Sequence, residues 1–352
     1  MGVTEKKDLA YSSLISAVRS RTAKGFIPNW SAGGRKTQDR TEPPLGAFVL
    51  EKLYQKYSES WLVDLLWDDL AIQMDWFWSN RLLDGFIALG SDQVYYPNSH
   101  NANSMQGARF ESGLDNSPMY DGDFFKDGLM QLYDVGMISL VLQECESLAR
   151  LSLVIGRDEF EWEQRAEMLK FRIGQLWNDH EGIFANKFPN GTFSERISPT
   201  SFYPLLSNVA TDEQAESIAK HWLMNQTRFC IGEQTSACFW GLPSISADDP
   251  AFSKLGYWRG FVWGPMCFLV YSALQNYSHL PHISTAKKHL VSQMSDMFLV
   301  LWKEKGRICE NYSPSHFSSD CTGDKFYHWG ALTGLLSLLD EESKAINELE
   351  LQ

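Results

Sequence analysis

Hydrophobic residues recur along this chain at intervals of three and four positions. Leu62, Leu66, Leu70 and Met74 are spaced four residues apart, which places their side chains along one face of a helix. The same kind of pattern predicts helices near 4–20, 44–57, 135–155, 162–176, 211–224, 262–278, 281–303 and 327–341. The acidic segment DEESKAINELE is expected to end the last of them. Clear strand patterns are almost absent, so the chain is predicted to be all-α.

Long connections separate the predicted helices. They are rich in Gly, Pro, Asn, Asp, Ser or Thr and span residues 22–43, 90–126, 178–200, 225–260 and 305–326. Long loops in a compact domain usually carry function. Because they alternate with helices, we expect them to gather over one end of a helical barrel. No linker, sharp repeat or low-complexity tract divides the 352 residues, which predicts one domain over residues 1–352.

The composition narrows the class of ligand. A formal net charge of −13 and a pI near 5.1 oppose encounter with nucleic acid or an acidic membrane surface. The 13 tryptophans exceed what a core normally needs, so some of them are expected to face a ligand. No segment approaches the roughly 18 apolar residues of a membrane span, and the N-terminus has no apolar core of signal-peptide length. We therefore expect a cytoplasmic protein with a small-molecule partner and no membrane or nucleic-acid partner; the sequence leaves homo-oligomer formation open.

The cysteines form no recognisable motif. They are Cys145, Cys230, Cys238, Cys267, Cys309 and Cys321. Six cysteines without a CxxC pair are sparse for this length, and unpaired cysteines are often buried. This pattern favours reduced structural thiols over disulfides.

A first candidate carboxylate lies in the stretch ESGLDNSPMYD, residues 111–121. Gly113 and Pro118 restrict the loop around Asp115, so its side chain can be held in position and project into a cleft. The alternative is an aspartate that caps its own turn or the next helix, since Asp is frequent at both places. The local sequence leaves both interpretations open.

A second candidate is Glu310 in RICENYSPSHFSSD, two residues before Tyr312. Glycoside hydrolysis needs two carboxyl groups, one protonated to assist the leaving oxygen and one ionised to activate water. A solvated loop glutamate is the alternative.

Two further segments have the composition of ligand sites. In GYWRGFVWGPM, residues 256–266, three aromatic rings (Tyr257, Trp258 and Trp263) and Arg259 lie between glycines, and flat rings can stack on sugars. A tryptophan-rich packed loop is the alternative. In GGRKTQDRTEPP, residues 33–44, basic residues and Gln38 suggest either a pocket for an anionic group or a solvated charged run.

Metal sites are not indicated by the remaining polar clusters. Asp121, Asp123 and Asp127 lack the glycine and terminal glutamate of a calcium loop. His279 and His282 lie three residues apart without a third ligand, which favours surface or capping roles.

Together, ARFESGLDNSPMYD, GYWRGFVWGP, ENYSP and FYHWGAL resemble glycoside hydrolase family 63, and GFIPNW with GGRKTQDRTEPP is closest to its mannosylglycerate hydrolase branch. The resemblance implies an (α/α)6 barrel and inverting hydrolysis of an α-glycoside, most simply mannosylglycerate or glucosylglycerate, without metal or organic cofactor. Asp115 would be the general acid and Glu310 the general base, about 6.5–9.5 Å apart. To keep Asp115 protonated near neutral pH, burial or a neighbouring carboxylate such as Glu111 would be needed.

The same resemblance implies roles for residues around the two acids. Tyr257, Trp258 and Trp263 would contact the aglycone, Gln38 would lie near its carboxylate, and Trp329 in FYHWGAL would line the sugar site. Arg40 and Arg259 are added as candidate substrate-binding residues because of their charge, and Tyr312 because it neighbours Glu310.

One family feature is missing. Family members carry a W-x-W-D segment upstream of the region matching GFIPNW, and this chain has none, so the barrel is expected to lack about two N-terminal helices. This leaves a truncated isoform or a catalytically impaired carbohydrate-binding paralogue as alternatives. Trehalase-like or oligosaccharide α-glucosidase activity is a further alternative, although Leu114 stands where trehalases have Trp before the acid.

Overall fold

The structure is a computed structural model with two compact units. It describes residues 6–94, 101–232, 234–236, 238–254, 256–315, 321–323 and 326–350. The first unit comprises Met1–Asp115, Tyr120–Leu176 and Asn186–Phe193; the second comprises Asn116–Met119, Trp177–Ala185 and Ser194–Gln352. Each unit is described by itself.

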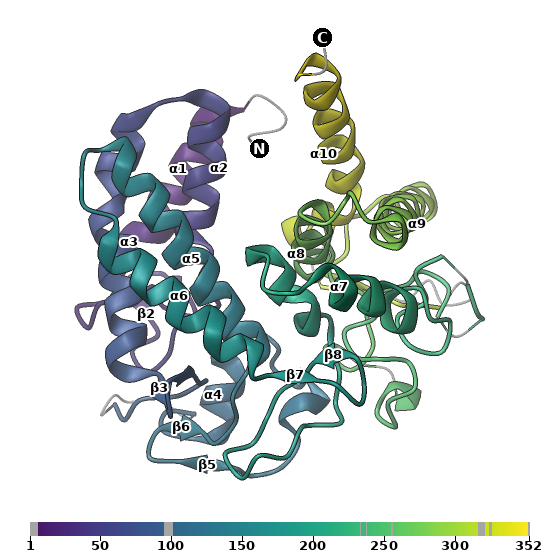
Figure 1. Ribbon diagram of the computed structural model, residues 1–352, viewed down its shortest axis with the longest axis horizontal. Helices are drawn as coiled ribbons and strands as arrows, with labels where there is room; N and C mark the ends of the chain where they lie inside the picture. The colour runs from purple at the N-terminus through teal and green to yellow at the C-terminus, as the bar shows by residue number, and fades with distance from the viewer. Residues whose placement is uncertain are drawn as a thin grey trace. The chain divides into compact units, whose positions relative to one another are not determined.

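The first unit is a helical assembly around one buried helix (Figure 1). Its helices are α1 (Lys7–Arg19), α2 (Gly46–Tyr57), α3 (Ser60–Asn80), α4 (Met105–Glu111), α5 (Val135–Val154) and α6 (Phe160–Gly174). Helix α5 packs against α2, α3 and α6 and is buried along most of its length. The helix predicted over 135–155 is therefore an inner helix, since a helix that is apolar on nearly every side needs neighbours on nearly every side.

Three short antiparallel hairpins accompany these helices. They are β1–β2 (Ser31–Ala32 with Arg35–Lys36), β3–β4 (Leu82–Leu83 with Phe86–Ile87) and β5–β6 (Phe125–Lys126 with Leu129–Met130). Each has a two-residue turn with positive φ at both positions: Gly33-Gly34, Asp84-Gly85 and Asp127-Gly128. Gly-Gly and Asp-Gly are the sequences that such turns favour.

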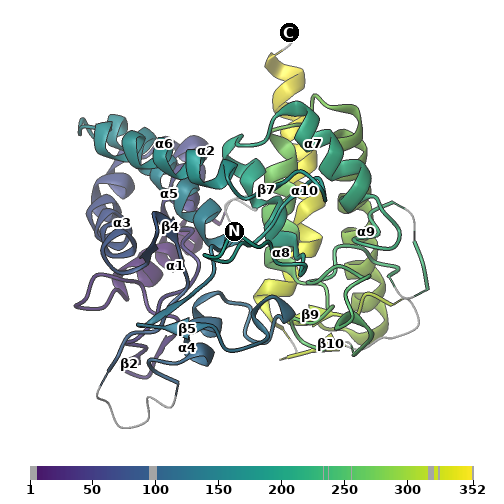
Figure 2. The same ribbon diagram turned by 60° about the horizontal axis from the view of Figure 1, so that its bottom comes forward.

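The second unit also consists mainly of helices. Its elements are β7 (Trp177–Asn178), β8 (Ile183–Phe184), η3 (Pro199–Ser207), α7 (Asp212–Ile218), η4 (Ala219–Leu223), η5 (Phe252–Lys254), α8 (Gly264–Gln275), α9 (Pro281–Lys305), β9 (Asn311–Tyr312), β10 (Cys321–Thr322) and α10 (His328–Glu350). Helix α10 packs against α8 and α9, and strand β9 contacts α10 (Figure 2).

Two glycines allow the backbone to approach closely where α8 and α10 begin. A Cβ atom at Gly264 would lie 2.0 Å from the carbonyl oxygen of Trp329, and one at Gly330 would lie 1.8 Å from that of Cys309. A side chain at either position would force the backbone apart. These contacts fix Trp329 and the segment that leads into Glu310.

The helices predicted from periodicity are present, with two differences. Helix α4 lies inside the segment predicted as the 90–126 loop, because Ser104 accepts a hydrogen bond from Gly107 N–H and caps the short helix. Helix α10 continues to Glu350 instead of ending at the acidic segment, because Glu, Lys, Ala and Leu are good helix formers.

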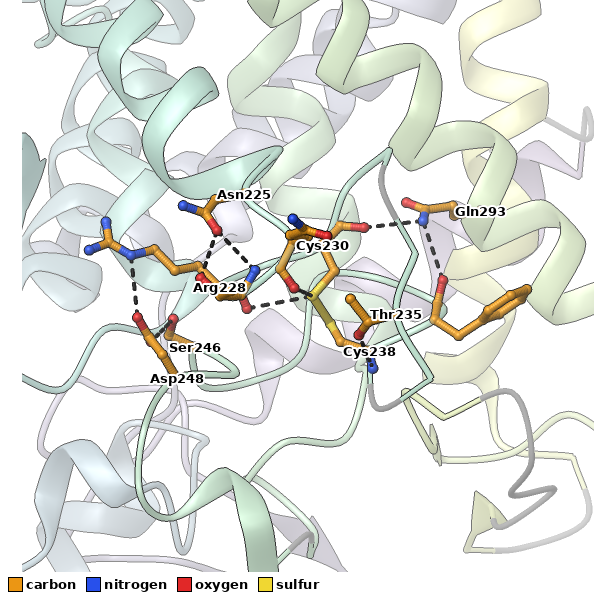
Figure 3. Close-up of a disulfide and its surroundings, with 11 residues drawn as sticks. Asn225, Arg228, Cys230, Thr235, Cys238, Ser246, Asp248 and Gln293 are labelled. Carbon is orange, nitrogen blue, oxygen red and sulfur yellow. Dashed lines mark hydrogen bonds and ion pairs between the residues drawn. A yellow bond between two sulfur atoms is a disulfide. The ribbon is translucent and has the colours of Figure 1, made fainter.

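The interpretation of the cysteines as reduced thiols is wrong for three of them. Cys230 and Cys238 form a disulfide with their Cα atoms 6.1 Å apart, within the span that a disulfide bridges (Figure 3). Cys309 is also disulfide-bonded, whereas Cys145 and Cys267 are free and buried. The loop between Cys230 and Cys238 is further held by Gln293, whose amide donates to the carbonyl oxygen of Cys230 (3.2 Å).

Among the described residues, no helix combines the length and apolar character needed to cross a membrane.

Candidate active site

Asp115 lies in a turn that follows α4 in the first unit. Gly113 has φ +70°, which favours glycine, and the Ser112 hydroxyl donates to the carbonyl oxygen of Arg109 and accepts from Leu114 N–H. The carbonyl oxygen of Asp115 accepts a hydrogen bond from the Gln106 amide (3.2 Å). The aspartate is half-buried and its backbone is held from both sides, as expected for a positioned group.

A buried ion pair lies at the end of the helix that leads to this turn. Arg81 Nε lies 2.6 Å from Glu111 Oε1, and its NH2 lies 2.9 Å from Oε2. The backbone N–H groups of Thr41 and Gly90 donate to the same carboxylate. Since Glu111 accepts four N–H bonds, two of them from a guanidinium, it ties the end of α4 to Arg81, Thr41 and Gly90.

A carboxyl that the sequence interpretation missed lies against Gly113, in the turn that carries Asp115. Glu42 Oε1 accepts a hydrogen bond from the Asn29 amide, and its Oε2 would lie 3.0 Å from a Cβ at Gly113. Desolvation raises the pKa of Glu42 to about 8, with Asp115 and Glu111 adding to the rise. Pro43, the next residue, disfavours the helical region for Glu42 and so favours an extended backbone there.

Gln38 and Arg40 are placed in the same unit. The Gln38 amide donates weakly to the carbonyl oxygen of Lys36 (3.4 Å). Arg40 is buried, binds Asp39 at 2.6 Å, donates to Asn29 and lies over the ring of Phe110. Their predicted contacts with substrate stay predictions.

Glu310 has a defined hydrogen-bond partner in the second unit. The Tyr257 hydroxyl donates to Glu310 Oε1 at 2.8 Å. Tyr257 has φ +35°, an uncommon backbone conformation for a bulky residue. Two hydrogen bonds fix this conformation. Arg259 N–H donates to the Gly256 carbonyl oxygen (2.6 Å), and the Trp263 indole N–H donates to the Tyr257 carbonyl oxygen (3.1 Å). Such strained residues often occur at functional sites.

The aromatic residues around Glu310 are packed on one another. Trp258 and Trp263 stack face to face, with centroids 3.6 Å apart, and are 3% and 0% exposed. Trp329 meets Trp263 edge-on and is half-buried. Tyr312 is buried and its hydroxyl donates to the carbonyl oxygen of Gly330 (3.2 Å). Tyr257, Arg259 and Trp329 are therefore the more accessible members of this group.

Asn116 is a second residue that the sequence interpretation missed. It follows Asp115 directly but belongs to the second unit. Its side-chain oxygen accepts from Trp258 N–H (2.9 Å), and its backbone carbonyl accepts from the Arg259 guanidinium (3.0 Å). The structure thus brings Asn116, Tyr257, Trp258, Arg259 and Glu310 together, while the predicted separation of Asp115 and Glu310 stays a prediction. Asn in a turn next to an acid carries no distinguishing sequence signal.

No group of three or more His, Cys, Asp or Glu side chains is arranged to hold a metal ion in the part of the chain that the structure describes. The donors at the two sites described above are carboxyl, hydroxyl and amide groups, which suit proton transfer and hydrogen bonding.

Comparison with known proteins identifies relatives of this chain. The family model described as "Mannosylglycerate hydrolase MGH1-like glycoside hydrolase domain" matches residues 4–329. The mannosylglycerate hydrolase MGH1 of Selaginella moellendorffii is 30% identical over 119 residues, which cover 34% of this chain and 22% of that protein. The aligned part is thus about a fifth of the length of this relative.

Solved structures resemble this chain over almost its whole length. The GH63 mannosylglycerate hydrolase from Thermus thermophilus in complex with glucose has a TM-score of 0.73 and 18% identity, and the match covers 96% of this chain and 90% of that chain. The neutral trehalase Nth1 from Saccharomyces cerevisiae has a TM-score of 0.75 and 16% identity, covering 96% and 69%. At these identities the likeness shows the mostly helical fold. The family match confirms the resemblance that the sequence motifs suggested.

Proposed function

Because the chain belongs to the family of mannosylglycerate hydrolase MGH1-like glycoside hydrolase domains, we propose that it hydrolyses a small α-glycoside with inversion at the anomeric carbon. Mannosylglycerate and glucosylglycerate are the proposed substrates. The names of the relatives support this choice, as do the Thermus structures with glucose and with Tris and D-glycerate. The trehalase likeness concerns the fold alone.

In the proposed reaction Asp115 is the general acid and Glu310 the general base. Asp115 donates its proton to the glycosidic oxygen as the bond from that oxygen to the anomeric carbon breaks. Glu310 takes a proton from the water whose oxygen bonds to the same carbon.

The hydrogen bonds of the 256–263 loop carry this proposal. Tyr257 binds the candidate base, and Trp258 N–H binds Asn116, the residue after the candidate acid. One strained loop is therefore tied both to Glu310 and to the neighbour of Asp115 in the sequence. Catalysis depends on such positioning of reacting groups.

Substrate contacts are proposed for the more accessible side chains of the site. Trp329 would line the sugar, and Tyr257 and Arg259 would contact the aglycone. Gln38 and Arg40 are proposed to contribute near the aglycone carboxylate. Trp258, Trp263 and Tyr312 would shape this wall from behind.

The mechanism also requires a particular arrangement of the whole chain. We propose that the two units together form one (α/α)6 domain, in which the carboxyls of Asp115 and Glu310 are about 6.5–9.5 Å apart, leaving room for the attacking water. A crystal structure with an unreactive substrate analogue would measure this separation.

The function is tested by a hydrolysis screen with mannosylglycerate, glucosylglycerate and trehalose. Asp115→Asn and Glu310→Gln are expected to lower kcat by about 10²–10⁴-fold while an inhibitory sugar analogue still binds. Proton NMR of the first product formed should show the anomer opposite to that of the substrate.

Asp123→Asn and Glu195→Gln are matched controls, since both side chains are exposed. They are expected to retain the parent rate. Parent-level turnover by either active-site variant would remove that residue from its proposed role, and retention of configuration would rule out inversion.

A further inference from the structure

Gly323 lies opposite Glu310 at the end of the hairpin formed by β9 and β10. The pair Asn311–Thr322 ends this antiparallel ladder, and the next step of the same register places Glu310 opposite Gly323. Gly323 is exposed and has φ +85°. Such a φ favours glycine, so the backbone beside the candidate base has a conformation that few other residues adopt.

The two residues approach more closely than opposite residues of a hairpin usually do. Cβ atoms directly opposite each other in an antiparallel pair are typically about 4.5–5.5 Å apart. A Cβ atom at Gly323 would lie 2.4 Å from the Cβ of Glu310 and 2.7 Å from its Oε2. The three nearest atoms among the described residues all belong to the Glu310 side chain. At this exposed position it is therefore Glu310 that leaves no room for a side chain.

The two carboxylate oxygens of Glu310 have different surroundings. Oε1 accepts the hydrogen bond of the Tyr257 hydroxyl at 2.8 Å, whereas Oε2 lies on the side of Gly323. A glutamate side chain is long and has several rotamers, so it needs more than one contact to be held in a single position. Tyr257 and the backbone of Gly323 provide two such contacts.

We propose that Gly323 is a positioning residue for the candidate base: its backbone holds the Glu310 carboxylate on the Tyr257 hydroxyl, and its lack of a side chain leaves Oε2 accessible to the attacking water. This inference rests on the proposed role of Glu310. Oε2 takes a proton from the water as the oxygen of that water bonds to the anomeric carbon and the glycosidic bond breaks.

The variant Gly323→Ala tests this role. The added methyl group would overlap with Glu310 and push its carboxylate away from Tyr257. Because a misplacement of about 1 Å can cost about 10²-fold in rate, kcat should fall by about that factor. An inhibitory sugar analogue should bind as it does to the parent, since the change concerns the base.

Gly306→Ala is the matched control. Gly306 is also exposed, lies in the same unit and has positive φ (+60°), but no atom of the described residues lies within 4 Å of its Cβ position. The control repeats the strain of an alanine at positive φ without a contact to Glu310. It should keep the parent kcat. An equal loss of kcat in both variants would overturn the proposal, because strain alone would explain it.

A double-mutant cycle with Tyr257→Phe shows whether the glycine acts through the tyrosine hydroxyl. If Gly323→Ala moves the carboxylate, the hydrogen bond from Tyr257 is already lost, and adding Tyr257→Phe should lower kcat little further. Losses that multiply would show that the two residues act independently and would overturn the proposal.

An NMR measurement on the parent chain decides the contact without turnover. In the full chain labelled with ¹³C at glycine and glutamate, the Hα protons of Gly323 should show a nuclear Overhauser effect to the Hβ protons of Glu310. The signal is assigned by its loss in Glu310→Gln, which carries no label at that position. If the chain hydrolyses none of the glycosides, the proposed function fails, and this effect still shows whether Gly323 holds Glu310. Its absence in the parent would overturn the proposal.

A second variant covers the case in which Gly323→Ala does not fold. Combined with Glu310→Gly, the alanine meets none of the three atoms that it would otherwise overlap, so the double variant should fold as Gly306→Ala does. Circular dichroism measures this. A double variant that also fails to fold would show that the glycine is needed for a reason other than Glu310, and the proposal would be wrong.

Discussion

The two candidate carboxylates are held by different physical means. In the first unit, the segments beside the Asp115 turn carry charged or amide groups: Glu42 lies against Gly113 and binds Asn29, and Glu111 pairs with Arg81. Around Glu310, in the second unit, a tyrosine hydroxyl provides the hydrogen bond, and stacked indole rings support that tyrosine.

This difference matches what each group must do. A general acid needs surroundings that keep its proton on, and nearby negative charge with partial desolvation does this. A general base must stay ionised, and a hydroxyl donor stabilises the ionised form. The two sides should consequently fail in different ways: damage to the charged side should cost stability and alter pH dependence, and damage to the aromatic side should cost turnover.

The largest effect is expected from Arg81→Leu. Arg81 is 1% exposed, and its guanidinium donates to both oxygens of Glu111 and to Asp92. Its removal leaves the buried Glu111 carboxylate without its charged partner, which typically costs about 3–5 kcal/mol of unfolding free energy. Urea denaturation followed by circular dichroism measures this cost.

The control for Arg81 is Arg35→Leu in the exposed strand β2. A surface change of this kind is expected to stay within about 0.5 kcal/mol. Equal losses for the two variants would show that the ion pair does not hold the acid side together.

A smaller effect, on rate, is expected from Tyr257→Phe. The ring keeps its edge contact with Trp263, but the hydroxyl that donates to Glu310 is lost. A hydrogen bond to a charged group contributes about 1.5–3 kcal/mol, so kcat/KM should fall by about 10–100-fold at nearly unchanged stability. Steady-state kinetics on the substrate found in the screen gives this number.

Tyr271→Phe provides the matched comparison. Its hydroxyl accepts a hydrogen bond from Gln275 in the same helix, α8, and belongs to no part of the proposed site. This variant should keep the parent kcat/KM. A rate for Tyr257→Phe equal to that of Tyr271→Phe would contradict the positioning role of Tyr257.

The sequence predicted most helices because their periodicity is local. The two-residue hairpins were missed although Asp84-Gly85 and Asp127-Gly128 carry the turn signal, because strands of two residues show no alternation. Helix α4 was missed because seven residues are too few for a helical period to stand out.

The site was predictable only in part, because sequence motifs are local and the contacts between distant segments are not. Motifs singled out Asp115, Glu310 and the Tyr257 loop, but the partners of these residues come from distant positions. Glu42 stands in a segment dominated by basic residues, so its acidity passed unnoticed. No local pattern reveals that Asn29 and Gly113 surround it, since contacts between distant segments depend on the fold.

The smallest effect concerns the pH dependence of stability, to which two carboxyls of the first unit contribute: the buried Glu144 and the half-buried Glu42. Desolvation is the main cause that raises the pKa of Glu144 to about 7 and that of Glu42 to about 8. In the unfolded chain both titrate near 4.3, so between that value and the folded pKa the native state binds more protons than the unfolded state. Stability should therefore fall as pH rises from about 4.3, with the contribution of Glu144 complete near pH 7 and that of Glu42 near pH 8.

Urea unfolding at a series of pH values measures these two windows. Glu144→Gln should flatten the stability curve mainly below pH 7, and Glu42→Gln should also flatten the step between pH 7 and 8. In the second unit burial raises the pKa of Tyr271, Tyr277 and Tyr312 to about 12, well above this range. Tyr271→Phe should for this reason leave the slope between pH 4 and 8 as it is. The opposite result would be a parent stability that rises with pH across this range and a slope that neither glutamate variant changes. It would show that both carboxyls are ionised in the folded protein. Charge would then not distinguish the acid side from the aromatic side.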